Sequence, residues 1–203
     1  MKTKQRILDG ARELFNELGY EQVTIRMIAL KLEMSSGNLN YHFKKREEIL
    51  EALYFQMVKG FDQRISDLPE TEISFGQIKN DIYVSMERML AYKFIWTNLY
   101  SILKNSKKIS EHFLGVYKAR LAGNLFLYKR LTEMGLMRSA NFSQEYEMLS
   151  ERMINFGDTW IYTSEVYRKK STKENIERQS KAMLAMIYPY LTEEGVTAYS
   201  KVL

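Results

Sequence analysis

The sequence contains no cysteine, which excludes disulfide bonds, thiolate zinc sites and cysteine nucleophiles. This absence is compatible with a reducing cytoplasm, where we expect the protein. Only two prolines occur in 203 residues, so long stretches are free to form helices. No apolar run approaches the roughly 20 residues that a membrane-spanning helix needs. With 45% hydrophobic residues, the chain can form one or two helical domains with buried cores.

Motifs of enzymes and metal sites are also missing. Only two histidines are present, His42 and His112, and no Glu-x-x-His pair, H-E-x-x-H, G-x-S-x-G or Walker-type loop occurs. Glu147, Glu151 and Asp158 share one side of a predicted helix and could form paired acids. A solvated or subunit-facing strip is the interpretation we favour. We therefore expect no enzyme activity, no metal and no cofactor.

The most informative stretch of the sequence runs from Thr24 to Phe43 and predicts two short helices joined by a tight turn. Apolar residues of the first helix recur at the spacing of one helical face, namely Ile25, Ile28, Ala29 and Leu32. Ser35 can cap the second helix by accepting a backbone N–H bond. Leu39 and Phe43, four residues apart, would form the inward face of that helix.

The outward face of the second helix carries small or hydrogen-bonding residues and no carboxylate. These residues are Ser36, Gly37, Asn38, Asn40, Tyr41 and His42. A short helix of this kind, braced by another across its back, is typical of a helix-turn-helix, which places a recognition helix in the major groove of DNA.

Positive charge is concentrated around the same stretch. Between Thr24 and Arg46 there are five positive residues and one negative residue, a net charge of +4 in a chain whose total is +5. This pattern indicates a phosphate-binding surface. On charge alone, a solvated basic helix pair without a ligand is an equal alternative.

The stretch also resembles the N-terminal domain of the TetR family of bacterial transcriptional regulators, over about Lys4 to Leu53. The matching residues are Thr24, Ile28, Ala29, Leu32, Ser35, Gly37, Asn38, Leu39, Tyr41, His42, Phe43, Glu47 and Leu50. The family usually has tyrosine in place of Asn40 and lysine in place of Arg46. An asparagine at position 40 could pair with an adenine edge, and Arg46 keeps the charge for a phosphate contact.

We predict from these observations that the helix-turn-helix binds double-stranded DNA at a near-palindromic operator. Base reading is assigned to Asn38 and Asn40, with Gly37 allowing close approach of the backbone. Phosphate contacts are assigned to Thr24, Arg26, Tyr41, His42, Lys45 and Arg46, and the predicted DNA-binding set also includes Ser35 and Ser36.

The resemblance implies an all-α fold, with a three-helix DNA-binding domain and a larger helical bundle for ligand binding and dimerisation. We place the DNA-binding domain at residues 1–46, a connecting helix at 47–68 and the larger domain at 69–203. Beyond the connecting helix, apolar periodicity predicts helices over about 74–92, 94–103, 109–134, 144–167 and 172–188, and a short final helix after Pro189.

The helices over 144–167 and 172–188 each carry apolar stripes. In the TetR family the last two long helices pack against their copies in a homodimer, so the resemblance implies an interface here. We assign it to Tyr146, Leu149, Met153, Phe156, Ile176, Met183 and Ile187. The alternative is that the stripes belong to the core of a single chain, and the sequence leaves open which stripe faces a partner.

Family members usually bind small molecules in the larger domain. Aromatic, methionine and polar residues that could line such a cavity are Met86, Trp96, Tyr100, Phe113, Tyr117, Asn155 and Trp160. The hypothesis is a sequence-specific transcriptional regulator, a repressor that a small apolar or aromatic effector releases from DNA. The alternative is a DNA-bound structural or protein-interaction factor with a filled core and no effector.

Overall fold

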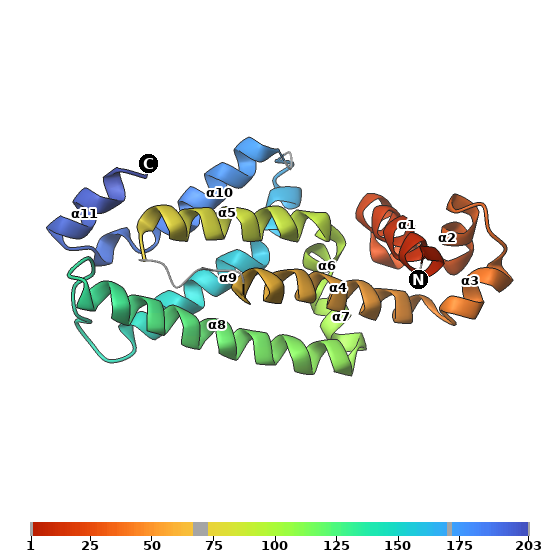
Figure 1. Ribbon diagram of the computed structural model, residues 1–203, viewed down its shortest axis with the longest axis horizontal. Coiled ribbons are helices and arrows are strands. Elements are labelled where there is room, and N and C mark those ends of the chain that lie inside the picture. Colours follow the sequence, from red (N-terminus) through yellow and green to blue (C-terminus); the bar gives the residue numbers. More distant parts are fainter. Residues whose placement is uncertain (1, 67–72, 170–171, 203) are drawn as a thin grey trace. The chain divides into compact units, whose positions relative to one another are not determined.

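The structure, a computed structural model, describes residues 2–66, 73–169 and 172–202. These residues form helices and their connections, without a strand, and a single antiparallel bridge joins Met137 to Leu191. The predicted all-α fold is therefore confirmed (Figure 1). Within these residues, no helix has both the length and the apolar content needed to cross a bilayer.

The helices fall into two compact units, made of Met1–Pro69 with Ala91–Ile109 and of Glu70–Leu90 with Ser110–Leu203. The elements that lie wholly in the first unit are α1 (Lys2–Leu18), η1 (Tyr20–Gln22), α2 (Ile25–Lys31), α3 (Ser36–His42), α4 (Arg46–Ser66), α6 (Lys93–Thr97) and α7 (Leu99–Asn105). The second unit holds most of α5 (Phe75–Ala91) and α8 (Lys107–Glu133), and all of α9 (Glu145–Val166), α10 (Lys173–Ala185), η2 (Tyr188–Tyr190) and α11 (Glu193–Ser200). The predicted boundaries of the DNA-binding domain at residue 46 and of the connecting helix at residue 68 stay predictions. The second of these boundaries, near Pro69, lies outside the described residues.

The core of the first unit forms because α2 and α3 are too short to bury their own apolar sides. Ile7, Ala11 and Phe15 of α1 are fully buried. The Phe15 ring lies 5.2 Å from that of Tyr20 and 5.1 Å from that of Phe94, measured between centroids. These residues of α1 are part of the core, and α1 braces the helix pair from behind.

The single helix predicted over 94–103 is wrong, because the chain forms α6 and α7 with Asn98 between them. The Asn98 side-chain amide donates to the Phe94 carbonyl at 2.9 Å, and the Thr97 hydroxyl donates to the Lys93 carbonyl at 3.2 Å. Side chains that bond to nearby backbone in this way compete with helix continuation. Tyr100, one of the residues predicted to line an effector cavity, is 82% exposed at the start of α7.

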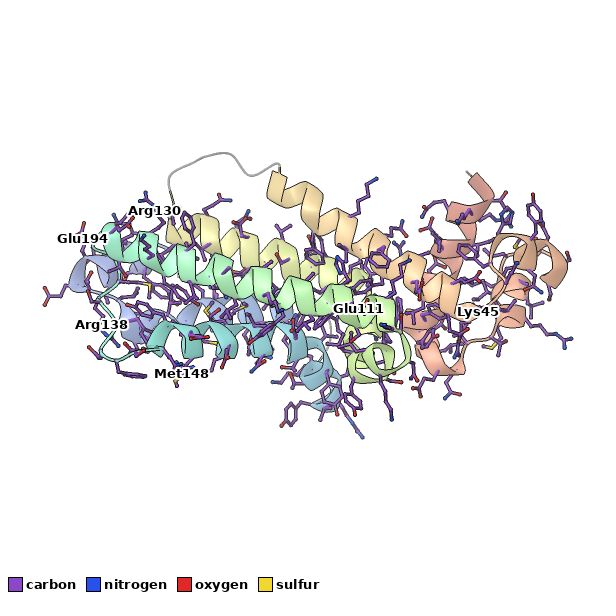
Figure 2. All side chains as sticks on the ribbon, turned by 90° about the horizontal axis from the view of Figure 1, so that it is seen from below. Lys45, Glu111, Arg130, Arg138, Met148 and Glu194 are labelled. Carbon is purple, nitrogen blue, oxygen red and sulfur yellow. The ribbon has the colours of Figure 1, made fainter. Side chains whose placement is uncertain are left out.

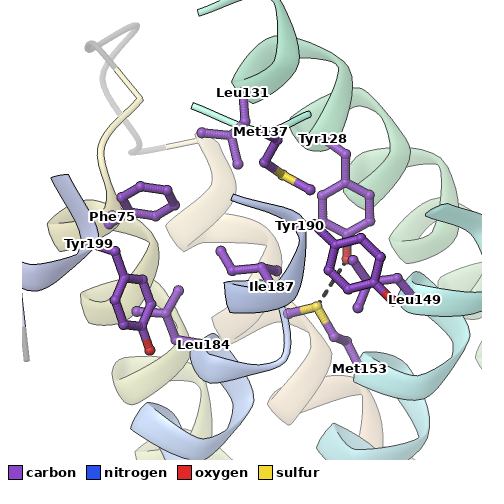
Figure 3. Close-up of a cluster of buried hydrophobic side chains, with 10 residues drawn as sticks. All are labelled: Phe75, Tyr128, Leu131, Met137, Leu149, Met153, Leu184, Ile187, Tyr190 and Tyr199. Carbon is purple, nitrogen blue, oxygen red and sulfur yellow. Dashed lines mark hydrogen bonds between the residues drawn. The ribbon is translucent and has the colours of Figure 1, made fainter. Parts of the chain in front are cut away.

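The core of the second unit draws side chains from most of its helices (Figure 3). Its buried residues are Phe75, Tyr128, Leu131, Met137, Leu149, Met153, Leu184, Ile187, Tyr190 and Tyr199. The Tyr128 hydroxyl donates to the Met153 sulfur at 3.0 Å, and burial raises the pKa of Tyr128 well above its usual value. The hydroxyl therefore stays protonated, and α8 and α9 are joined by a polar bond inside an apolar core.

This core corrects the predicted dimer interface. Leu149, Met153, Ile176 and Ile187 are buried within the chain itself, so they have no surface to offer a second copy. Tyr146, Phe156 and Met183 are half-buried, and Tyr146 and Met183 pack against the same core. The apolar periodicity was read correctly as helical, but most of the assigned residues lie on the inward face.

Candidate nucleic-acid interface

Two side-chain caps set the positions of α2 and α3. The Thr24 hydroxyl accepts from the Met27 N–H at 3.3 Å, and the Ser35 hydroxyl accepts from the Asn38 N–H at 3.1 Å. Between the helices, Glu33 adopts a left-handed conformation with φ of 52°. The Ser35 cap confirms the predicted start of α3, whereas the capping role of Thr24 was not predicted.

The outer face of α3 is open along its length. Leu39 and the following Phe43 are buried, whereas Ser36, Gly37, Asn38, Asn40 and Tyr41 are exposed. Tyr41 is 85% exposed although it is aromatic, and its ring lies edge-on to that of the half-buried His42. A Cβ added at Gly37 would meet only the Ser35 hydroxyl, at 4.0 Å. Packing within the chain therefore does not require glycine at position 37.

The capping hydroxyls can still serve a ligand. Thr24 and Ser35 are both exposed, and each uses one acceptor lone pair for its helix. A hydroxyl also has one donor and a second acceptor site. Each cap can thus hold its helix and donate to a phosphate oxygen at the same time.

Exposed cations lie at both ends of the helix pair. Within the described residues, Arg26, Lys44 and Lys45 are exposed and form no ion pair. Lys31, in contrast, pairs with Glu13 at 3.0 Å. Lys44, which is not in the predicted DNA-binding set, lies beside Lys45 just before the start of α4.

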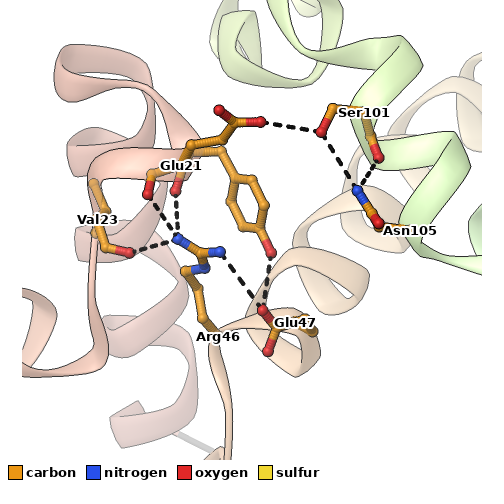
Figure 4. Close-up of polar contacts among 7 residues, drawn as sticks. Glu21, Val23, Arg46, Glu47, Ser101 and Asn105 are labelled. Carbon is orange, nitrogen blue, oxygen red and sulfur yellow. Dashed lines mark hydrogen bonds and ion pairs between the residues drawn. The ribbon is translucent and has the colours of Figure 1, made fainter.

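Arg46 was expected to contact a phosphate, but the structure turns its guanidinium toward the protein (Figure 4). It donates to the backbone carbonyls of Tyr20, Glu21 and Val23 and lies over the Tyr20 ring. Burial raises the pKa of the Tyr20 hydroxyl, although the Arg46 charge opposes this effect. The phosphate role of Arg46 stays a prediction, and the structure shows its Nη1 engaged within the protein.

The acidic strip predicted on α9 is divided by the structure. Asp158 lies 2.6 Å from the Arg120 guanidinium of α8, and burial raises the pKa of its carboxyl despite this partner. Glu151 is exposed and accepts from the Tyr117 hydroxyl at 3.4 Å. Asp158 is thus part of the packing between α8 and α9 and not of a solvated strip. Within the described residues, no group of three acidic or histidine side chains could hold a metal.

The seven predicted effector residues do not meet in one described pocket. Asn155 is exposed and lines a shallow pocket of about 390 Å³ that includes none of the other six. Its walls are Phe142, Glu145, Met148, Glu151, Arg152 and Tyr190, and Figure 2 shows Met148 at the same end of the second unit as Arg138. Of the other six, Met86 and Trp160 are buried and Phe113 and Tyr117 half-buried in the second unit, whereas Trp96 and Tyr100 belong to the first.

Comparison with known proteins identifies the family. A family model described as "Bacterial regulatory proteins, tetR family" matches residues 7–53, which contain α2 and α3. A second, described as "Bacterial transcriptional repressor", matches residues 56–199, more than half of the chain. The chain belongs to the TetR family. The predicted resemblance is thereby confirmed, and it extends well beyond the helix-turn-helix.

Individual TetR-family relatives agree with this assignment. The chain is 30% identical over 77 residues to the transcriptional repressor Rv1474c of Mycobacterium tuberculosis, a match that covers 38% of this chain and 39% of that protein. It is 22% identical to the regulator HbdR of Aromatoleum sp., over 98% of this chain and 85% of HbdR. The crystal structure of a TetR-family regulator from Marinobacter aquaeolei shares the fold, with a TM-score of 0.86, 22% identity and coverage of 100% and 99% of the two chains.

Proposed function

We propose that this TetR-family chain binds a near-palindromic DNA operator as a homodimer and represses transcription until a small apolar or aromatic effector releases it. The observation that carries the proposal is the outer face of α3, which is exposed, free of carboxylates and flanked by unpaired cations. A face of this composition can enter a major groove without repelling phosphates.

The contacts divide into two kinds. Asn38 and Asn40 carry amides that can bond to base edges, with Gly37 allowing the backbone to approach. Thr24, Arg26, Ser35, Ser36, Tyr41, His42, Lys44 and Lys45 supply hydroxyl, phenol, imidazole and cationic groups for the phosphates and fix the register. In a two-fold dimer, two copies of α3 would meet successive major grooves about 34 Å apart.

The test of operator binding is selection of bound sequences from random DNA. We expect a near-palindromic site whose half-sites are separated by one helical turn or a multiple of it. That site should also occur upstream of the gene that encodes this chain. If no sequence is enriched at modest salt concentration, the proposal fails.

We propose that the dimer interface is formed by the outer face of α9 and α10, and not by the buried residues that were assigned to it from the sequence. Met148, Tyr162 and Val166 of α9 are 48%, 52% and 55% exposed, and their positions, with Asn155 and Thr159, follow helical spacing along one side. On the adjacent α10, Ala182 and Ala185 are exposed and would allow close approach of a second copy. Apolar side chains exposed along two neighbouring helices are typical of an interface between subunits.

For the effector, the supporting observation is Trp160. This side chain is 1% exposed, and its indole Nε1–H has no hydrogen-bond partner within the described residues. Buried donors are almost always paired, so a molecule that brings an acceptor to Trp160 would satisfy it. Two structures of similar fold contain small molecules: the SmeT–triclosan complex, with a TM-score of 0.63, and a regulator from Saccharomonospora viridis with choline, with a TM-score of 0.69.

The test of the effector is thermal unfolding of the chain against a panel of apolar and aromatic compounds. A compound that binds the folded state should raise the melting temperature in a dose-dependent manner. Trp160→Phe, which keeps a ring but removes the N–H, should reduce this shift. If no compound gives a shift, the alternative of a regulator with a filled core and no effector is favoured.

A further inference from the structure

The side chain of Arg46 contacts three kinds of group within the protein: backbone carbonyls, an aromatic ring and a carboxylate. Its Nη1 lies 3.1 Å from each of the carbonyl oxygens of Tyr20, Glu21 and Val23 (Figure 4). The guanidinium carbon lies 4.2 Å from the centre of the Tyr20 ring, and Nη2 lies 3.6 Å from a carboxylate oxygen of Glu47. A phosphate could reach Nη1 only by competing with these three carbonyls.

The carbonyls that Arg46 binds belong to the short 3-10 turn Tyr20–Gln22 and to Val23, which follows it. The Tyr20 carbonyl also accepts from the Val23 N–H at 3.4 Å, whereas the last carbonyls of such a turn have no partner inside it, and backbone carbonyls near a core need partners. A planar guanidinium can serve several carbonyls and lie flat on an aromatic ring, whereas a lysine ammonium is a compact point charge that cannot reproduce both contacts. The TetR family usually has lysine at position 46. An arginine there is suited to contact both the carbonyls and the Tyr20 ring, which a lysine could not do.

The position of Arg46 in the chain gives these contacts a consequence. Residues Tyr20–Val23 form the entrance to the α2–α3 pair, because they connect α1 to α2. Lys44 and Lys45 form its exit, and Arg46 is the first residue of α4. The entrance and the exit of the helix pair thus meet at one side chain. Movement of residues 20–23 relative to the start of α4 would have to break these bonds.

We propose that Arg46 is a positioning residue for DNA recognition, which holds the entrance and exit of the α2–α3 pair together and does not contact a phosphate. The proposal rests on the proposed function, since it concerns how α3 meets its operator. Operator recognition requires one orientation of α3 together with correctly placed lysines, whereas binding to random DNA depends mainly on charge. Loss of the Arg46 contacts should therefore lower operator affinity more than affinity for random DNA.

The test compares variants that separate charge from geometry. Arg46→Lys keeps the charge and loses the planar contacts, whereas Arg46→Gln loses the charge and keeps an amide that can donate to carbonyls. We expect Arg46→Lys to bind operator about tenfold more weakly, the loss that corresponds to one good charge-assisted bond, with little change on random DNA. The slope of log affinity against log salt should match the parent in both variants. Arg130→Lys, the same substitution at an exposed position of α8 that lies outside the predicted DNA-binding set, is the control and should bind like the parent.

A phosphate contact would give a different pattern. Arg46→Lys would then bind operator like the parent, and Arg46→Gln would reduce the magnitude of the salt slope by about one phosphate, or 0.9. Either result overturns the positioning role. If Arg46→Lys does not fold, as judged by circular dichroism, the salt slope of Arg46→Gln still decides between the two roles. If the parent itself prefers no sequence, the proposed function fails, and this is seen before any variant is compared.

Discussion

Glu145, at the start of α9, is held by contacts that make its charge part of the fold. Arg138 donates to both carboxylate oxygens, at 2.9 and 2.7 Å, and the Asn141 N–H donates at 2.7 Å. The bonds from Arg138 and then from Asn141 lower the pKa of Glu145 to about 2. The carboxylate thus ties the connection between α8 and α9 to the first turn of α9.

This shift predicts a pH dependence of stability. Because the folded pKa lies below the unfolded value of about 4.5, the ionised carboxylate stabilises the fold above pH 4.5. The stabilisation is lost as the pH falls toward 2. We expect Glu145→Gln to lower the melting temperature at pH 7 and to approach the parent between pH 4.5 and 2. Glu133→Gln, which breaks the exposed pair with Arg130 at 2.6 Å, is the control and should change little at any pH. A constant difference between Glu145→Gln and the parent across this range would contradict the assignment.

At the same scale, Asn38 and Lys45 separate base reading from phosphate binding. Asn38→Ala should lower the preference for operator over random DNA, by about 1–3 kcal/mol if the amide pairs with a base. Lys45→Ala should weaken binding to all sequences alike and reduce the salt slope by about one phosphate. Equilibrium binding to the selected operator and to a scrambled sequence, at several salt concentrations, distinguishes the two effects. If both variants bind operator like the parent, α3 is not the recognition helix.

At the scale of the element, α3 contains a glycine that its own packing does not need. A Cβ at Gly37 would meet nothing closer than the Ser35 hydroxyl, at 4.0 Å, and glycine inside a helix costs about 0.5–1 kcal/mol relative to alanine. We expect Gly37→Ala to stabilise the fold by roughly this amount in urea unfolding, and at the same time to weaken operator binding because the added methyl separates the backbone from DNA.

The matched control for this prediction is Gly123→Ala in α8. Its Cβ also meets nothing within 4 Å, so the stability gain should be similar without a change in DNA binding. Gly37→Ala with unchanged operator affinity would show that the backbone of α3 does not approach the DNA closely.

The elements also show what the sequence could predict. The start of α3 is decided locally by the Ser35 hydroxyl, and the start of α5 by the Ser74 hydroxyl, which accepts from the Gln77 N–H at 3.2 Å. The start of α3 was predicted from its cap and the helix over about 74–92 from apolar periodicity, and both starts are local signals because a cap and its partner are three residues apart. The partners of Arg46 lie 23 to 26 residues away and are backbone carbonyls, so their residue types carry no signal. For α9, apolar residues occur on more than one side, and periodicity cannot tell the core face from an interface.

At the scale of the whole molecule, recognition of a palindrome depends on two copies of α3 held at a fixed spacing. The proposed face of α9 and α10 can be tested with a charge placed on the exposed apolar stripe of α9. Val166→Glu would bury a carboxylate between subunits without a partner, which is strongly unfavourable. We expect this variant to be monomeric in analytical ultracentrifugation and to lose operator affinity, because each half-site would then be bound independently.

The control for the dimer is Phe126→Glu on α8, where the parent side chain is 63% exposed. Both variants replace an exposed apolar residue by the same charge, so a general effect of charge on solubility or folding would appear in both. A dimeric Val166→Glu together with a monomeric Phe126→Glu would move the interface from α9 to α8. If both variants remain dimers, neither Val166 nor Phe126 lies in the subunit interface. The predicted outcome, a monomer only for Val166→Glu, requires that the apolar stripe exposed on α9 is buried between two copies, because the core of a single chain leaves it uncovered.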